Sequence, residues 1–129
     1  MNTLFIDSSA WIEYFAGTEK GRRIREYIQK EGVAIHITGL IVSEVCTKFL
    51  KDGLVAEQAM VMLRDLSVLQ PYDYELGLET AKIYVKERKT RPKFGLADAH
   101  VLAASRKKKA KLITCDRDFE GIAEVVLIK

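Results

Sequence analysis

Short apolar runs rich in β-branched residues alternate along the chain with longer segments in which apolar residues recur every three or four positions. The short runs are typical of buried strands, and the longer segments are typical of helices with one buried face. Strands are therefore predicted at Leu4–Ile6, Val33–Thr38, Val68–Gln70, Leu112–Thr114 and Val125–Ile128. Helices are predicted over residues 10–16, 17–32, 40–50, 55–66, 74–89 and 96–108.

Strands that are separated by helices usually run parallel, because each helix crosses over one face of the sheet and returns the chain to the same edge. The alternation therefore predicts an α/β protein whose mainly parallel sheet is covered by helices on both faces. The 129 residues, 48% hydrophobic and 30% charged, are enough for one sizeable core. The loop-like stretch KTRPKFG, residues 89–95, is too short to separate domains, so we expect a single domain over residues 1–129.

The sequence predicts a protein that stays in the cytoplasm and has no membrane partner. It has no run of 18 or more apolar residues, and Asp7 and Glu13 come too early for a basic leader followed by an apolar stretch. In a reducing compartment Cys46 and Cys115 are most simply buried thiols, although the sequence leaves a disulfide open. The two histidines are too few and too scattered for a zinc site.

Acidic side chains stand at four places where the neighbouring residues are apolar. Asp7 and Asp116 follow the first and fourth predicted strands, and ligands of parallel sheets bind outside the carboxyl ends of the strands. Glu44 lies within an apolar helical segment, and Asp98 lies in the first turn of another. Taken singly, a glutamate can extend into solvent and a first-turn aspartate suits the helix dipole.

Taken together, the four carboxylates indicate a site for a divalent cation. If they converge at one edge of the sheet, they raise one another's pKa, and a cation removes this repulsion. Oxygen ligands without a cluster of Cys or His fit Mg²⁺ or Mn²⁺. We therefore expect Asp7, Glu44, Asp98 and Asp116 to be the metal ligands and catalytic residues. A metal-activated water would then attack a phosphate without a protein nucleophile.

Basic residues are concentrated in one part of the chain. Between Lys82 and Lys111 there are eleven Lys or Arg and two acids, although the whole chain carries a net charge of only +3. Such a segment suits a nucleic-acid backbone, and a solvated helix face is the alternative interpretation. The run Arg106–Lys109 would help to gather a polyanion. The residues expected to contact RNA are Lys86, Arg88, Lys89, Arg91, Lys93 and Arg117, the last of which can equally neutralise a neighbouring aspartate.

The four acidic segments resemble those of PIN-domain ribonucleases, most closely VapC-type toxins of toxin–antitoxin pairs. These segments are FIDSSAWIEYF with Asp7, VSEV with Glu44, LADAHVLAA with Asp98 and LITCDRDF with Asp116. The resemblance implies an α/β/α sandwich with a sheet of four or five strands, and a homodimer that cleaves RNA with Mg²⁺ or Mn²⁺. It also implies an antitoxin whose tail occupies the active-site groove. Asp118 matches a more variable position of the family, and Thr114 and Ser8 match polar supports of the carboxylates or of the scissile phosphate.

Two other functions remain open from the sequence. One is a PIN-type nuclease of RNA maturation that has no antitoxin. The other is a non-enzymatic, Mg²⁺-binding regulatory module of the receiver type, which needs a lysine at the end of a late strand, and no predicted strand ends in one. Conspicuous residues outside the acidic set have structural interpretations: Trp11, Tyr14 and Phe15 are expected in the core or a dimer contact, and His100 in the core or on a helix surface.

Overall fold

The computed structural model describes residues 2–129. The strands of this range are β1 (Asn2–Ile6), β2 (Val33–Thr38), β3 (Val68–Gln70), β4 (Lys111–Thr114) and β5 (Val125–Leu127). The helices are α1 (Ser8–Ala16), α2 (Glu19–Ile28), α3 (Gly39–Lys51), α4 (Ala56–Leu66), α5 (Tyr74–Arg88) and α6 (Leu96–Lys107), and a 3₁₀ turn, η1, spans Arg117–Phe119. Every strand and helix predicted from the sequence is present, with ends that differ by a few residues.

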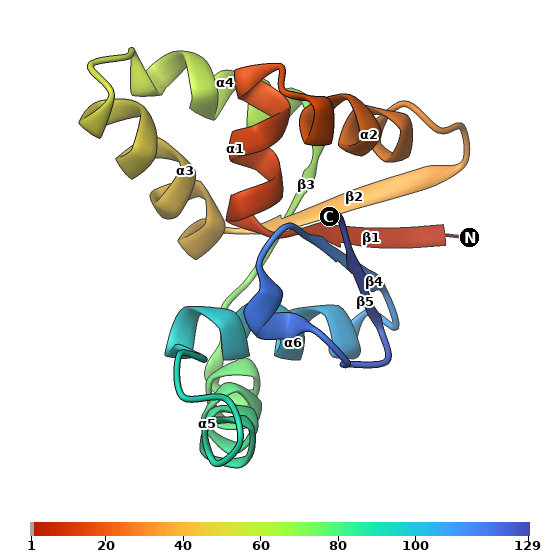
Figure 1. The fold of residues 1–129 in the computed structure, drawn as a ribbon, viewed down its shortest axis with the longest axis vertical. Helices are drawn as coiled ribbons and strands as arrows, with labels where there is room; N and C mark the ends of the chain where they lie inside the picture. The colour runs from red at the N-terminus through yellow and green to blue at the C-terminus, as the bar shows by residue number, and fades with distance from the viewer. Residues whose placement is uncertain (1) are drawn as a thin grey trace.

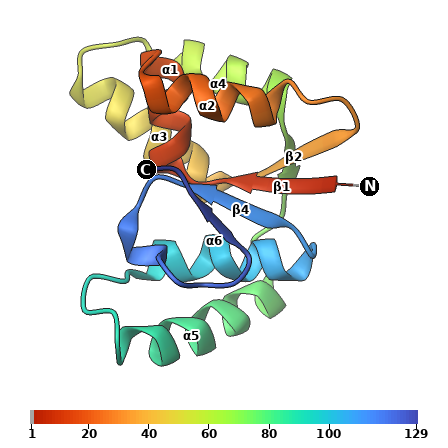
Figure 2. The ribbon, with the colours of Figure 1, turned by 45° about the vertical axis from the view of Figure 1, so that its right-hand side comes forward.

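The five strands form one parallel sheet in the order β3-β2-β1-β4-β5. Helices α1 to α4 cover one face and helices α5 and α6 cover the other, as Figures 1 and 2 show. This arrangement confirms the predicted three-layer α/β/α sandwich. In the register, Phe5 of β1 lies beside His36 of β2 and Leu112 of β4.

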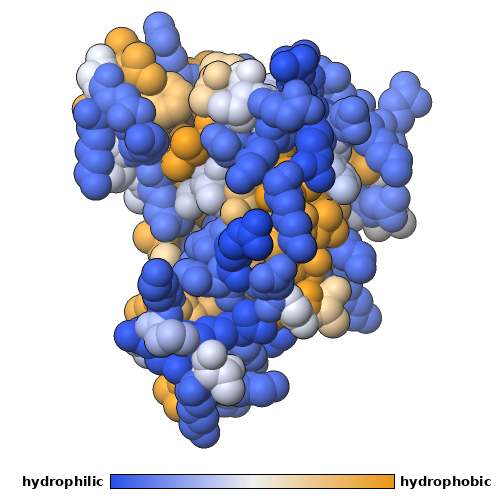
Figure 3. Space-filling model, in the orientation of Figure 1, coloured by the Kyte–Doolittle hydropathy of each residue, from blue (hydrophilic) through white to orange (hydrophobic). Residues whose placement is uncertain are grey.

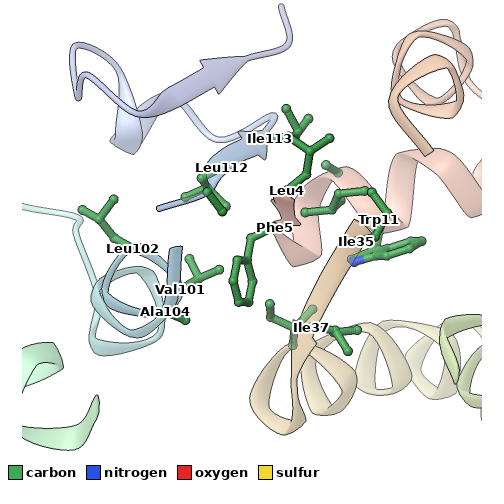
Figure 4. Close-up of a cluster of buried hydrophobic side chains, with 14 of the residues drawn as sticks. Leu4, Phe5, Trp11, Ile35, Ile37, Val101, Leu102, Ala104, Leu112 and Ile113 are labelled. Atoms are coloured by element: carbon green, nitrogen blue, oxygen red, sulfur yellow. The ribbon is translucent and has the colours of Figure 1, made fainter. Parts of the chain in front are cut away.

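The core lies on both faces of the central strands. Because side chains alternate along a strand, Leu4 of β1 points toward Trp11 of α1, whereas Phe5 points toward Val101 and Ala104 of α6 (Figure 4). Phe5 and Trp11 are completely buried. Strands with two covered faces read as continuous apolar runs, which is why β1 could be predicted from only three residues.

Helices follow the strand ends almost without loops. Thr38 ends β2, and its hydroxyl oxygen accepts a hydrogen bond from the amide of Ile41 in the first turn of α3 (3.4 Å). Asp7 follows β1, and α1 begins at the next residue. Helices α1 and α2 approach closely at Gly21, where a Cβ atom would lie 2.1 Å from the carbonyl oxygen of Glu13. A larger residue at this position would force the two helices apart.

Several single residues outside the acidic set adopt the expected environments. Trp11 stacks on Phe15 within the core. His100 is completely buried, and its Nε2 lies 2.7 Å from the hydroxyl of Thr38, which links α6 to the start of α3. Cys46 and Cys115 are both free thiols, but each is only partly buried, contrary to the expectation of buried thiols. None of the helices within residues 2–129 is long and apolar enough to cross a membrane.

Candidate metal centre

The topology brings the ends of β1 and β4 together at one edge of the sheet. The two strands are neighbours, with Ile6 beside Ile113, and the amide of Asp7 donates a hydrogen bond to the carbonyl oxygen of Ile113 (2.9 Å). Asp116 follows β4 in the chain by two residues and caps η1. The carboxylates at both strand ends therefore lie at the same edge, as the sequence predicted.

Two hydroxyl groups hold the side chain of Asp7. The Thr114 hydroxyl donates to Asp7 Oδ2 (2.8 Å), and the Ser9 hydroxyl donates to the same atom (2.9 Å). Each hydroxyl oxygen also accepts a hydrogen bond from the backbone that follows β4: Thr114 from the amide of Asp116 (3.0 Å) and Ser9 from the amide of Cys115 (3.1 Å). This network fixes one oxygen of Asp7 and leaves the other free of these donors.

Burial dominates the electrostatics of Asp7. The residue is only 6% exposed, and burial raises the pKa of its carboxyl above the ordinary value. The hydrogen bonds from Thr114 and Ser9 oppose this rise, and the negative charge of Asp116 adds to it. A cation at this edge would favour the ionised form of Asp7 and relieve the repulsion between the two aspartates.

Three carboxylates beside Asp7 are arranged as a group that can hold an ion. Within residues 2–129, one carboxylate oxygen each of Asp98, Asp116 and Asp118 lie within 4.8 Å of one another. The amide of Gly95 donates to Asp98 Oδ2 (2.7 Å), and the amide of Asp118 donates to Asp116 Oδ1 (2.8 Å). Backbone groups therefore orient two of the three carboxylates.

The pKa of Asp98 is raised to about 6. Burial is the largest cause, and the charges of Asp7, Asp116 and Asp118 raise it further, while the hydrogen bond from Gly95 lowers it. Since three other carboxylates act on this one group, they share a single electrostatic environment.

Glu44 is half-buried on α3 and belongs to the same environment. Its pKa is raised to about 7, first by burial and then by the charge of Asp7, with a smaller contribution from Asp98. A hydrogen bond from the Ser8 side chain lowers it. Glu44 and Asp7 therefore border the group of Asp98, Asp116 and Asp118, although they lie outside it.

The donor set fits Mg²⁺ or Mn²⁺. Two oxygen ligands of one octahedral Mg²⁺ lie at most about 4.2 Å apart, twice the metal–oxygen distance. The three aspartate oxygens lie within 4.8 Å of one another, so small side-chain adjustments would bring them around one ion. The ligands are all carboxylates. Hard cations such as Mg²⁺ and Mn²⁺ bind carboxylate oxygens, whereas softer metals favour sulfur or imidazole ligands. Water and a substrate phosphate can complete such a coordination shell.

The basic residues expected to contact RNA are either exposed or engaged in contacts within the protein. Lys86, Lys89 and Lys93 are exposed at the end of α5 and in the loop before α6, and Arg117 is exposed on η1. The loop adjoins the acidic group, because the amide of Gly95 donates a hydrogen bond to the carboxylate of Asp98. Arg88 is partly engaged, donating to the Tyr84 hydroxyl (2.7 Å) and to the carbonyl oxygen of Phe94 (3.3 Å). Arg91 is turned toward η1 and is mostly buried.

The run Arg106–Lys109 lies away from the acidic group. Asp98 stands at the start of α6 and Lys107 at its end, about 14 Å apart along the helix axis at 1.5 Å per residue. Figure 2 shows α6 running from the edge where β1 ends toward the edge where β1 begins. These basic residues therefore do not border the acidic site, contrary to the expectation that they gather substrate there with residues 86–93.

Sequence reasoning missed two contributors to the site. It expected Ser8 as a support, and Ser8 acts on Glu44, but the hydroxyl that holds Asp7 belongs to Ser9. The position of Ser9 two residues after Asp7 is a usable signal, because Ser and Asp in such spacing often bond locally. The contact of Arg91 with η1 joins residues far apart in the chain, so no local signal exists for it.

Comparisons with known proteins agree with this architecture. Residues 4–125 match the family model of the PIN domain, and no curated protein matches the sequence significantly. Among solved structures, a toxin–antitoxin complex from Klebsiella pneumoniae has 24% identity, a TM-score of 0.71 and 98% of each chain covered. The sarcin–ricin loop cleaving toxin VapC20 of Mycobacterium tuberculosis has 21% identity and a TM-score of 0.73, with 95% of this chain and 98% of that chain covered. VapBC2 of Rickettsia felis, solved with promoter DNA, has 9% identity and a TM-score of 0.72, with 97% of this chain and 96% of that chain covered. At these identities the likeness to the solved structures concerns the fold.

Proposed function

The chain belongs to the PIN-domain family, and on that premise we propose that it is a Mg²⁺- or Mn²⁺-dependent endoribonuclease, the toxin of a toxin–antitoxin pair. The observation that carries this proposal is the group of Asp98, Asp116 and Asp118, whose oxygens lie within 4.8 Å of one another at the carboxyl edge of the sheet. Three such carboxylates repel one another unless a cation is shared among them.

In the proposed reaction, water attacks phosphorus and the bond to the 3′ oxygen breaks, which leaves a 5′-phosphate and a 3′-hydroxyl. A bound divalent cation lowers the pKa of the attacking water and neutralises charge on the phosphate. Asp98, Asp116 and Asp118 would hold the cation, with Asp7 held beside them by Thr114 and Ser9. Water alone supplies the nucleophile.

Glu44 is the residue best suited to accept the proton that the water loses. In the metal-free protein its pKa is raised to about 7, first by burial and then by the charge of Asp7, and the burial that is the largest cause would remain with a cation bound. The Ser8 side chain lies near this carboxylate and opposes the rise of its pKa. In this scheme Glu44 is a catalytic residue more than a metal ligand.

We propose that the RNA backbone lies along the loop between α5 and α6. Lys89 and Lys93 are exposed in the loop and Arg117 on η1, and they would supply positive charge for phosphates on either side of the scissile bond. Lys86, which was also expected here from the sequence, lies with Lys82 on the surface of α5. Such contacts give affinity without sequence preference. RNA selection then depends on the shape of the substrate, such as an unpaired loop.

The antitoxin that we propose as a partner would contact two surfaces, one acidic and one apolar. The acidic group would attract a basic side chain of a partner segment. At the end of α3 and in the turn before α4, the side chains of Leu50, Leu54 and Val55 are exposed. Figure 3 shows apolar surface at the upper left, the region where Figure 1 places this turn. A segment with one basic side chain and several apolar ones, long enough to follow α3, matches both surfaces.

We also propose that a second copy of the chain packs on the outer face of α5. This face carries the exposed apolar side chains of Tyr74, Leu78 and Val85, although the opposite face of the helix already packs on α6. Along one flank the charges change from Glu75 and Glu79 to Lys82 and Lys86. If the two-fold axis is perpendicular to these helices, they run antiparallel, so the acidic half of each faces the basic half of the other.

A cleavage assay on total RNA tests the proposed function. Purified protein is incubated with Mg²⁺, with Mn²⁺ or with EDTA, and the new 5′ ends are mapped. We expect cleavage only with a divalent cation and products that carry a 5′-phosphate. Cleavage in EDTA, or products that end in 2′,3′-cyclic phosphate, would refute a metal-activated water. If no RNA is cut under any condition, the ribonuclease proposal is wrong, and the antitoxin proposal loses its basis.

A further inference from the structure

Arg91 joins the loop before α6 to the turn η1. Its Nη1 donates to the carbonyl oxygens of Asp118 (3.0 Å) and Glu120 (2.7 Å), and its Nε donates to the carboxylate of Glu87 (2.9 Å). The contacts connect residues 27 and 29 positions apart in the chain. The guanidinium therefore bridges two loops that no strand pairing holds together.

The ion pair of Arg91 with Glu87 is largely removed from solvent, whereas the hydrogen bond to the Glu120 carbonyl is exposed. The side chain of Arg91 is 23% exposed and that of its ion-pair partner Glu87 is 14% exposed. A partly buried ion pair with good geometry is screened less than a surface pair, and a planar guanidinium can hold several oxygens at once in a fixed geometry. Beneath it, the ring of Phe94 packs edge-on against the ring of Phe119 at 5.6 Å between centroids. Arg91 and Phe94, which belong to the same loop, thus both contact η1, one by hydrogen bonds and the other by ring packing.

The held turn carries one of the three clustered carboxylates. The amide of Asp118 donates to Asp116 Oδ1 (2.8 Å), and its carbonyl oxygen accepts from Arg91 (3.0 Å). Both backbone polar groups of Asp118 are therefore fixed, one by a neighbouring carboxylate and the other by the arginine. Gly121, at a φ of 90°, reverses the chain directly after the second carbonyl that Arg91 holds. A left-handed residue at this point favours glycine.

We propose that Arg91 is a positioning residue, which fixes the distance of Asp118 from Asp98 and Asp116 by holding the carbonyl groups of η1. The inference rests on the proposed function for its consequence, cation binding, but its geometry concerns the metal-free protein. In this role Arg91 acts from behind the carboxylates and does not contact the phosphate of the substrate. Outer partners of metal ligands typically change metal affinity by about 10- to 100-fold when they are replaced.

The variant Arg91→Lys keeps the positive charge and removes the planar group that bonds two carbonyls. In metal-free protein we expect faster amide hydrogen exchange in residues 116–122, with the exchange of β1 and β4 unchanged. For Mn²⁺, titration calorimetry is expected to show a Kd about 10-fold higher or more. RNA binding in EDTA, measured by fluorescence anisotropy, is expected to stay within about twofold of wild type. Arg22→Lys, an exposed arginine on α2, is the matched control and should change none of these quantities.

A rescue experiment separates positioning from general stability. Free guanidinium at millimolar concentration should restore Mn²⁺ affinity to Arg91→Ala, whereas ammonium at the same ionic strength should not. If Arg91→Ala does not fold, Glu87→Gln tests the same contact more gently and should raise exchange in residues 116–122 to a smaller extent.

Two outcomes would overturn the proposal. One is wild-type exchange in residues 116–122 together with unchanged Mn²⁺ affinity in Arg91→Lys. The other is a loss of RNA binding in EDTA as the main effect of that variant, which would make Arg91 a phosphate contact. A wild-type protein that cuts no RNA would refute the ribonuclease, while the exchange measurement would still decide the role of Arg91.

Discussion

At the scale of single residues, the raised pKa values of Asp98 and Glu44 make the stability of the protein depend on pH. The pKa of Asp98, about 6, and that of Glu44, about 7, lie above the ordinary values of 3.8 and 4.5. The folded, metal-free protein therefore binds these protons more tightly than the unfolded chain does. The contribution of both groups to stability is complete below about pH 4 and is lost as the pH rises through 6 to 7.

We predict that Asp98→Asn raises the melting temperature of the metal-free protein by a few degrees at pH 7.5. The asparagine removes a repelled charge and still accepts the hydrogen bond from Gly95. Cleavage with Mg²⁺ should fall by on the order of 100-fold or more. Melting curves in EDTA between pH 5 and 8, beside an RNA assay, check both effects. Asp65→Asn, an exposed carboxylate on α4, should leave both unchanged, and undiminished cleavage by Asp98→Asn would contradict its role.

Thr114 tests the hydroxyl network around Asp7. In Thr114→Val the amide of Asp116 loses its acceptor and Asp7 loses a donor, in a completely buried position. We predict that the free energy of unfolding falls by about 1–3 kcal/mol and that Mn²⁺ affinity falls as well. Urea unfolding and calorimetry measure the two effects. Thr114→Ser keeps the hydroxyl and should retain most of the metal affinity; equal losses in both variants would mean that packing of the methyl group matters instead.

Sequence reasoning at this scale succeeded where a residue's neighbours in the chain determine its environment. Asp7 and Asp116 follow apolar runs, and Asp98 opens a helix, so their placement at one sheet edge could be predicted. Asp118 was ranked second, yet its carboxylate belongs to the group of three. Ser9 bonds Asp7 locally and could have been found from its spacing. Arg91 acts across 27 positions of the chain, a contact that a single sequence does not reveal.

At the scale of elements, the basic segment divides according to the direction of α6. We predict that Lys89→Ala with Lys93→Ala weakens RNA binding and lowers its dependence on salt, with a logarithmic slope smaller by about 1.4, since each contact to a single strand contributes about 0.7. The matched variant Lys108→Ala with Lys111→Ala makes the same change of charge at the opposite end. Anisotropy titrations in EDTA at several salt concentrations compare the two. Equal effects from both pairs would mean that only net charge matters.

The outer face of α5 makes a prediction about assembly. Glu75→Lys alone and Lys86→Glu alone should each weaken the dimer, because like charges then meet across the two-fold axis. The double variant restores complementarity and should dimerise like wild type. Sedimentation equilibrium gives the dissociation constants. A wild-type monomer at all concentrations, or a double variant weaker than either single one, would contradict this interface.

The helix and strand predictions were accurate because each segment has one dominant periodicity. The range 17–32 was too wide for α2, which begins after its cap Thr18 and ends at Ile28, before Gly32 turns the chain at a φ of 77°. The stripe of Tyr74, Leu78 and Val85 shows the limit of such patterns. Apolar residues on both faces of α5 identify a helix, but the pattern alone cannot separate the face that meets α6 from the face that is exposed.

At the scale of the whole molecule, the fold brings residues that are far apart in the sequence close together. Asp7 and Asp116 lie 109 positions apart in the chain, yet β1 and β4 are neighbours in the sheet. The parallel topology could be predicted from the alternation of elements, and the carboxyl edge follows from it. The strand order and the packing of η1 against the loop before α6 required the structure, because they depend on which surfaces fit.

The most direct test of the account is an anomalous difference map from crystals soaked in Mn²⁺. We expect a peak within bonding distance of the carboxylate oxygens of Asp98, Asp116 and Asp118, and the loss of this peak in crystals of Asp98→Asn. Crystals of the wild-type protein that show no anomalous density at these side chains in saturating Mn²⁺, or that bind the ion elsewhere, would contradict a shared cation at the edge of the sheet.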